Sequence, residues 1–129
     1  MPTTFADSAE ADMDNMWGQF LKNKVNSFIK WDLVRFFHDN PYTAETADNI
    51  AGFIARDAKT VHRELDELVH SGIVAVQEVG GYQIYRFSDA DEVRQLIAQF
   101  MTACKERAFR VRAINTVIQG MHFTPRHDF

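Results

Sequence analysis

Four neighbouring polar residues have side chains of the kinds that contact nucleic acids. Lys59 and Arg63 carry cations that bind phosphates or the edge of guanine. Thr60 offers a hydroxyl to a phosphate and a methyl group to thymine, and His62 can contact a phosphate or a base. Their close spacing predicts that they act together if one element presents them on one side.

A predicted helix over residues 57–71 supplies that element. Asp57 is a suitable N-cap, Gly72 a suitable left-handed C-terminal cap, and the inner face consists of Val61, Leu65, Leu68 and Val69. A turn of about 100° per residue then places the remaining polar side chains outside or beside the outer face: Lys59, Thr60, Arg63, Asp66, Glu67 and His70. An ordinary solvated helix face has the same pattern, so the pattern fits both a DNA-contacting face and a merely solvated one.

The elements on either side of this helix favour a DNA-contacting helix over a merely solvated one. Thr46 can cap a short helix whose apolar positions lie between Ala47 and Ile54, and only a tight turn separates it from Asp57. After Gly72, two strands joined by Gly80-Gly81 read as a hairpin that pairs residue 79 with 82, 76 with 85 and 74 with 87. The sequence therefore predicts a helix-turn-helix over 46–71 and a wing over 73–87, an arrangement that places a helix in the major groove of DNA.

Long apolar helices are predicted at both ends of a single domain spanning 13–119. One helix begins near Met13 and a second runs from Ser27 to Asp39. The last, over 89–119, is about 45 Å long at 1.5 Å per residue, and its apolar stripe is longer than a compact core can cover. Phe109, on the opposite side of that helix, also favours a partner. We therefore expect a homodimer with an interface formed by Met16, Trp17, Phe20, Phe100, Cys104, Val111, Ile114 and Ile118.

Composition and charge set further limits. The 129 residues are 46% hydrophobic and carry a net charge of −4, but four acids lie in the first 15 residues, without which the chain is neutral. Residues 1–12 are predicted to be a disordered acidic tail and 120–129 a flexible tail. The start of the chain resembles no signal peptide and no segment reads as a membrane span, so we expect a cytoplasmic protein without a membrane partner.

The pattern from Lys59 to Val74 resembles winged helix-turn-helix repressors of the ArsR type and, more distantly, of the MarR type. The resemblance covers residues 30–88 and is carried by the runs KTVHRELDEL and SGIV, together with Tyr85-Arg86-Phe87. It implies a homodimeric transcriptional regulator that binds double-stranded DNA, with the positions of Thr60, His62 and Arg63 facing the DNA. Arg86 is the base in the predicted wing that can reach a phosphate.

Two features favour another hypothesis, a winged-helix protein-interaction module that does not bind DNA. Acids occupy positions 64, 66 and 67 of the predicted recognition helix, and the wing tip 79–82 has no base. No catalytic motif, cofactor loop or metal-ligand pattern stands out, so an enzyme is not predicted. Cys104 reads as a packing residue, and the two histidines at 122 and 127 read as a solvated tail. The sequence names no small-molecule effector.

Overall fold

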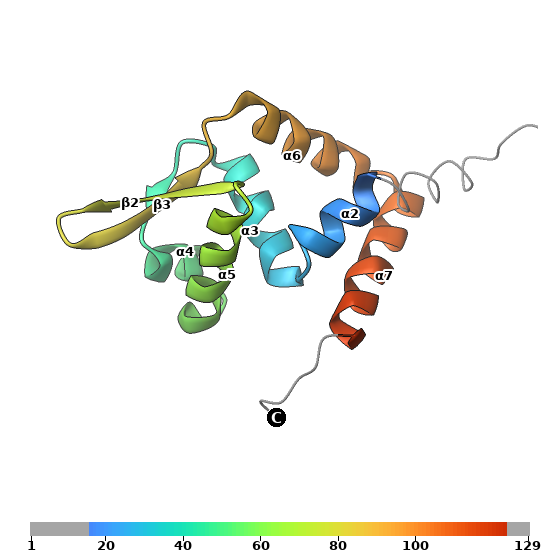
Figure 1. Ribbon diagram of the computed structural model, residues 1–129, viewed down its shortest axis with the longest axis horizontal. Helices are drawn as coiled ribbons and strands as arrows, with labels where there is room; N and C mark the ends of the chain where they lie inside the picture. The colour runs from blue at the N-terminus through green and yellow to red at the C-terminus, as the bar shows by residue number, and fades with distance from the viewer. Residues whose placement is uncertain (1–15, 124–129) are drawn as a thin grey trace, which may run out of the picture. The chain divides into compact units, whose positions relative to one another are not determined.

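The fold, known from a computed structural model, is described for residues 16–123, with side chains up to Met121. It is mainly helical with one small antiparallel sheet (Figure 1), as the predicted α+β class requires. The elements are α2 (Met16–Asn23), α3 (Phe28–Asp39), β1 (Ala44–Glu45), α4 (Ala47–Ile54), α5 (Ala58–His70), β2 (Val74–Val79), β3 (Tyr82–Phe87), α6 (Asp91–Ala103) and α7 (Arg107–Phe123).

The chain divides into two compact units instead of the single domain predicted over 13–119. One unit contains residues 29–101, with most of α3, all of α4 and α5, the sheet and most of α6. Among the described residues, the other unit combines 16–28 with 102–123, and so contains α2 and α7. No helix among residues 16–123 is long and apolar enough to cross a membrane. The predicted tail over 1–12 lies outside the described residues.

The helix ends in the central unit follow from local hydrogen bonds. The Thr46 side chain accepts from the backbone N–H of Asn49, and the Asp57 carboxylate accepts from the N–H of Thr60, so both predicted N-caps are confirmed. Ala55, between the two helices, has a left-handed backbone with φ 58°, and its N–H bonds back to α4. Gly72 has φ 85°, which suits glycine after the last turn of α5.

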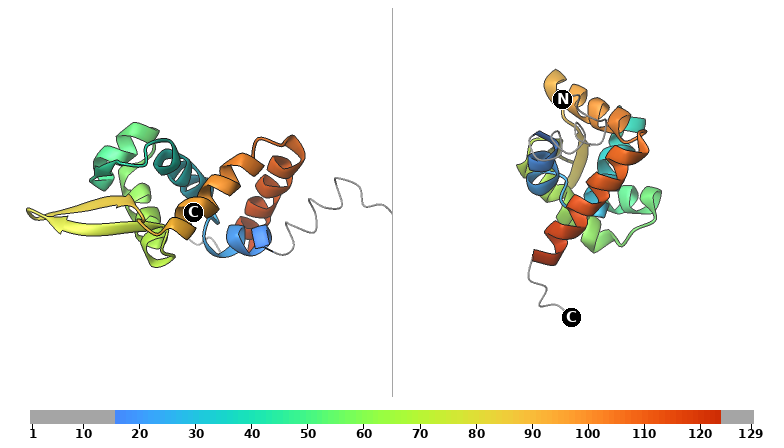
Figure 2. Two further views of the ribbon diagram at one scale, coloured as in Figure 1. Left: turned by 90° about the horizontal axis from the view of Figure 1, so that it is seen from above. Right: turned by 90° about the vertical axis from the view of Figure 1, so that its right-hand side faces the viewer.

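The sheet has strand order β1-β3-β2. The predicted hairpin register is confirmed, because Val79 faces Tyr82, Val76 faces Tyr85 and Val74 faces Phe87. Gly80 and Gly81 both have positive φ, as a type I′ turn needs. Within its unit the hairpin projects beyond the helices (Figure 2), and the residues at its tip are exposed. The two-residue strand β1, paired with β3 through Ala44 and Glu45, was not predicted.

A single apolar core holds the central unit together. Helix α3 buries Leu33, Val34 and Phe37, and α5 buries Val61, Leu65 and Leu68. The other apolar side chains of this unit that are at most 3% exposed are Ile50, Ala51, Ile73, Val74, Tyr85, Phe87, Ile97 and Phe100. Burying such side chains is the main favourable contribution to folding. It fixes which face of α5 points outward.

The prediction of one continuous helix over 89–119 is wrong. That stretch is two helices, α6 and α7, separated by a turn in which the N–H groups of Lys105 and Glu106 bond to carbonyls three residues back. Phe100 and Phe109 are nine residues apart, so a straight helix would place them on opposite sides. The break permits both to be buried, with exposed fractions of 0% and 6%.

Helix α7 continues to Phe123, past the predicted end at Gln119. Gly120 is helical, so residues 120–123 are not part of a tail, and those after 123 lie outside the described residues. Trp17 of α2 packs edge-on against Phe109 of α7, with ring centroids 5.9 Å apart. The burial of Phe109 within the chain therefore removes one reason for expecting a partner.

The residues predicted for a dimer interface fall into two groups. Trp17, Phe20 and Phe100 are buried in the single chain, where Phe100 packs on Trp31 at 5.2 Å. A second copy cannot cover surface that is already buried, so these three residues offer almost no surface to such an interface. Exposed or partly exposed members remain in α2, α7 and the preceding turn: Met16, Cys104, Val111, Ile114 and Ile118.

Candidate nucleic-acid interface

An open groove lies along the outward face of α5. It has a volume of about 390 Å³ and is lined by Lys59, His62, Arg63, Asp66, Glu67 and His70. These residues recur at intervals of three and four, the spacing of one helical face. Because Val61, Leu65 and Leu68 are fully buried on the other side, the apolar core holds this polar face toward solvent.

Three of the predicted contact residues are presented together in this groove. The side chains of His62 and Arg63 are 55% and 66% exposed, and Lys59 is also exposed. Thr60 does not line the groove. Its hydroxyl donates to the Asp57 carboxylate at 2.9 Å, so it completes the N-cap of α5. The backbone N–H of Thr60 donates to the same carboxylate, and this bond and the one from the hydroxyl lower the pKa of Asp57.

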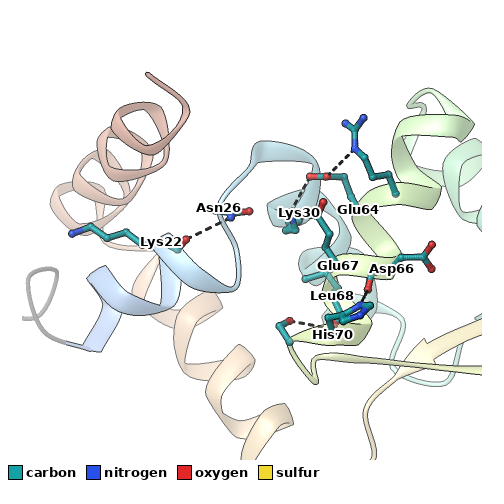
Figure 3. Close-up of polar contacts among 10 residues, drawn as sticks. Lys22, Asn26, Lys30, Glu64, Asp66, Glu67, Leu68 and His70 are labelled. Carbon is teal, nitrogen blue, oxygen red and sulfur yellow. Dashed lines mark hydrogen bonds and ion pairs between the residues drawn. The ribbon is translucent and has the colours of Figure 1, made fainter. Parts of the chain in front are cut away.

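A buried ion cluster behind the groove was not predicted. The Lys30 ammonium on α3 lies 3.2 Å from a Glu64 oxygen and 2.5 Å from a Glu67 oxygen on α5 (Figure 3). The side chains of Lys30 and Glu64 are 5% and 7% exposed, whereas that of Glu67 is 52% exposed. Lys30 thus pairs with two of the acids that the sequence counted against DNA binding.

A sequence signal for this cluster did exist. Lys30 has the spacing of the buried stripe of α3, three, four and seven residues before Leu33, Val34 and Phe37. Glu64 lies among the buried residues of α5 in the same way. A charged residue on an inner face needs an opposite charge, because burying an unpaired ion is costly. Searching for complementary charges on inner faces would have identified the pair.

The third acid of α5, Asp66, accepts a hydrogen bond from the sheet. Buried Tyr85 of β3 donates its hydroxyl proton to Asp66 Oδ1 at 2.6 Å, and His62 Nε2 lies 3.6 Å from Asp66 Oδ2. Burial and the Asp66 carboxylate both raise the pKa of Tyr85. The backbone carbonyl of Asp66 also lies 3.0 Å from His70 Nδ1. Asp66 therefore links the outward face of α5 to the sheet.

Arg86 does not join the groove. It lies near the base of the hairpin, where its guanidinium donates to Asp89 at 2.8 Å and its side chain is 38% exposed. The tip of the hairpin is apolar and open, with Val79 and Tyr82 52% and 65% exposed. The sequence predicted a phosphate contact from Arg86 in the wing, separate from the contact residues of α5, and this contact stays a prediction.

Comparisons with known proteins add no assignment: no protein-family model matches the chain, and no curated protein or solved structure matches it. Within the described residues, no group of three or more His, Cys, Asp or Glu side chains is placed to hold a metal ion. The chemistry of the groove therefore rests on its own residues: two cations, two histidines and two half-exposed carboxylates.

Proposed function

We propose that the chain is a winged helix-turn-helix regulator that binds double-stranded DNA in a sequence-specific manner, as a homodimer. In this proposal α4 and α5 are the helix-turn-helix, α5 enters the major groove, and β2 and β3 are the wing. The observation that carries the proposal is the outward face of α5, where Lys59, His62 and Arg63 line one open groove.

The acids of α5 are compatible with this function because each carboxylate contacts Lys30 or Tyr85. Lys30 neutralises part of the charge on Glu64 and Glu67 from the inner side, and Asp66 accepts a hydrogen bond from Tyr85. The two groove cations lie in the first half of α5, the half that a recognition helix inserts most deeply. The positive end of the helix dipole also lies there.

The homodimer would use the apolar surface that the terminal unit leaves exposed. On α7, Val111 and Ile118 are 45% and 37% exposed and one helical face contains both, seven residues apart. Ile114 lies between them and is partly exposed. A two-fold interface needs a patch that matches itself, and an apolar helix stripe meets that need. The interface residues of this proposal are therefore fewer than those predicted from the sequence.

Selection from a random duplex library, followed by fluorescence anisotropy on the selected site, tests the DNA proposal. Arg63→Ala should weaken binding roughly 5- to 150-fold, as expected when an arginine contact to a base of about 1–3 kcal/mol is lost. Arg35→Ala is the matched control, because Arg35 is an exposed arginine of α3 outside the groove and removes the same charge. Wild-type protein that binds no duplex at 50 mM salt would refute the proposal.

The apolar hairpin tip favours one alternative, a winged-helix module that binds protein. Val79 and Tyr82 are exposed side by side at a turn without a base, where a wing that follows the DNA backbone usually has one. Tyrosine is enriched at the centres of protein interfaces. In this alternative Tyr82→Ser abolishes co-purification of a protein partner and Arg63→Ala has no effect on it.

A further inference from the structure

Three side chains connect the sheet to the groove in a continuous series. Tyr85 comes from β3 and is 1% exposed, Asp66 and His62 come from α5, and both of the latter line the groove. The Tyr85 hydroxyl donates to one Asp66 oxygen at 2.6 Å, and the other Asp66 oxygen lies 3.6 Å from His62 Nε2. The rings of His62 and Tyr85 also meet edge to face, with centroids 6.1 Å apart.

This geometry restricts both polar groups in the groove. A buried tyrosine has few rotamers, so its short hydrogen bond fixes one oxygen of Asp66 and thereby the direction of the other. The second oxygen then faces one particular nitrogen of the imidazole. In a neutral histidine, the nitrogen that faces an anion tends to carry the proton, and the other nitrogen becomes the acceptor.

We propose that Tyr85 and Asp66 are positioning residues that set the base preference of His62. The inference rests on the proposed DNA-binding function and adds which base the groove selects. With the proton on Nε2, His62 presents Nδ1 as a hydrogen-bond acceptor. An acceptor pairs with the exocyclic amino group of adenine or cytosine in the major groove and rejects the acceptor edge of guanine.

The neighbouring charged groups have a different role in this arrangement. Lys59 and Arg63, four residues apart on the same face, are donors at any working pH and supply attraction to phosphate or to guanine at other positions. Glu67 is held by Lys30. Two histidines of the groove have a donor or acceptor character that depends on a neighbour: His70 Nδ1 lies 3.0 Å from the backbone carbonyl of Asp66, whereas His62 Nε2 faces the Asp66 carboxylate that Tyr85 holds.

Nitrogen NMR of the histidine ring tests the first half of the proposal without DNA. In the wild type near pH 8, His62 should be mainly protonated on Nε2. Asp66→Asn keeps an oxygen for Tyr85 and turns an amide N–H₂ toward Nε2, so the proton should move to Nδ1. An unchanged ring-nitrogen spectrum in Asp66→Asn, or a wild-type ring protonated on Nδ1, would overturn the proposal whatever the protein binds.

Selection from the random duplex library tests the second half. The wild type should prefer adenine or cytosine at one position per half-site by about 2- to 12-fold, the range of one hydrogen bond. Asp66→Asn should reverse that preference toward guanine or thymine, and His62→Ala should abolish it. Tyr85→Phe, which keeps the ring and releases Asp66, should weaken it. The control Lys59→Ala should lower affinity and leave the base preference at the His62 position unchanged.

The two proposals fail in different ways. Wild-type protein that selects no duplex refutes the DNA-binding function and the base preference together. Wild-type protein that selects a site, but with the same base preference in Asp66→Asn, refutes only the role of Asp66 and Tyr85.

Discussion

Replacing Lys30 by methionine tests the buried ion cluster that lies between α3 and α5. Methionine keeps an unbranched side chain of similar length and forms helices well, so the change removes the charge with little loss of packing. Glu64, which is 7% exposed, then loses its buried cation and keeps an ion pair with Arg63, whose Nε lies 3.5 Å away and whose side chain is 66% exposed to water. Removing one partner of a buried pair costs about 3–5 kcal/mol. The Glu67 pair adds at most about 1 kcal/mol, because that side chain is half exposed.

The free energy of unfolding, measured by urea titration and circular dichroism, should therefore fall by about 3–5 kcal/mol. Since small domains have about 5–15 kcal/mol in total, this is a large share. The melting temperature should fall by about 12 °C or more, at about 4 °C or more per kcal/mol. Lys22→Met, at an exposed lysine of α2, is the control and should change stability by less than about 0.5 kcal/mol.

The double variant Lys30→Met with Glu64→Met distinguishes two causes of the lost stability: the loss of the Lys30–Glu64 ion pair, and the burial of the Glu64 carboxylate without Lys30. With both ions gone, no buried charge is unpaired, and stability should return to within about 1 kcal/mol of the wild type or exceed it. A double variant as unstable as the sum of the two single variants would show that the residues do not interact. A loss below about 1 kcal/mol in Lys30→Met alone would also refute the argument.

Three other perturbations have a sign that the structure determines. Asp57→Asn keeps an acceptor for the Thr60 N–H but removes an ionisable group. In the wild type, the lowered pKa of Asp57 stabilises the fold above about pH 4, and this contribution is lost as pH falls through the pKa of the folded state. The free energy of unfolding of Asp57→Asn should therefore fall less steeply at acid pH than that of the wild type. Tyr85→Phe should remove a loss of stability above about pH 10 in the wild type, because the raised pKa of Tyr85 means that only the unfolded chain ionises there. Both are read from urea midpoints across pH. Gly72→Ala should cost about 1–2 kcal/mol in the same titration, since φ is 85° and alanine is strained there; an unchanged midpoint would contradict this.

The elements that the sequence predicted well are those determined by local chemistry. The caps at Thr46 and Asp57 are hydrogen bonds that span three residues, and the hairpin register follows from a two-residue glycine turn. Each is decided by neighbours in the chain. The outward face of α5 could also be predicted, because the apolar positions of an amphipathic helix determine its inner side.

What the sequence did not reveal depends on contacts between distant residues. Strand β1 has two residues, too few for any alternation, and it exists because β3 lies beside it. The break between α6 and α7 lies within a stretch whose apolar residues recur at helical spacing, and it becomes understandable only when Phe109 is seen packed on Trp17. In each case the partner lies tens of residues away.

The same limit explains why counting charges along α5 gave an incomplete account of the charges at its outward face. Counted in sequence, its acids at 64, 66 and 67 outnumber the cations Lys59 and Arg63. Counted in space, Lys30 of α3 belongs to the same group and brings the charges to balance. The Glu64 carboxylate is buried beside Lys30, whereas Asp66 and Glu67 line the groove beside the two cations and are 53% and 52% exposed. The electrostatic character of a helix face is therefore set by the charges that pack behind it as much as by its own sequence.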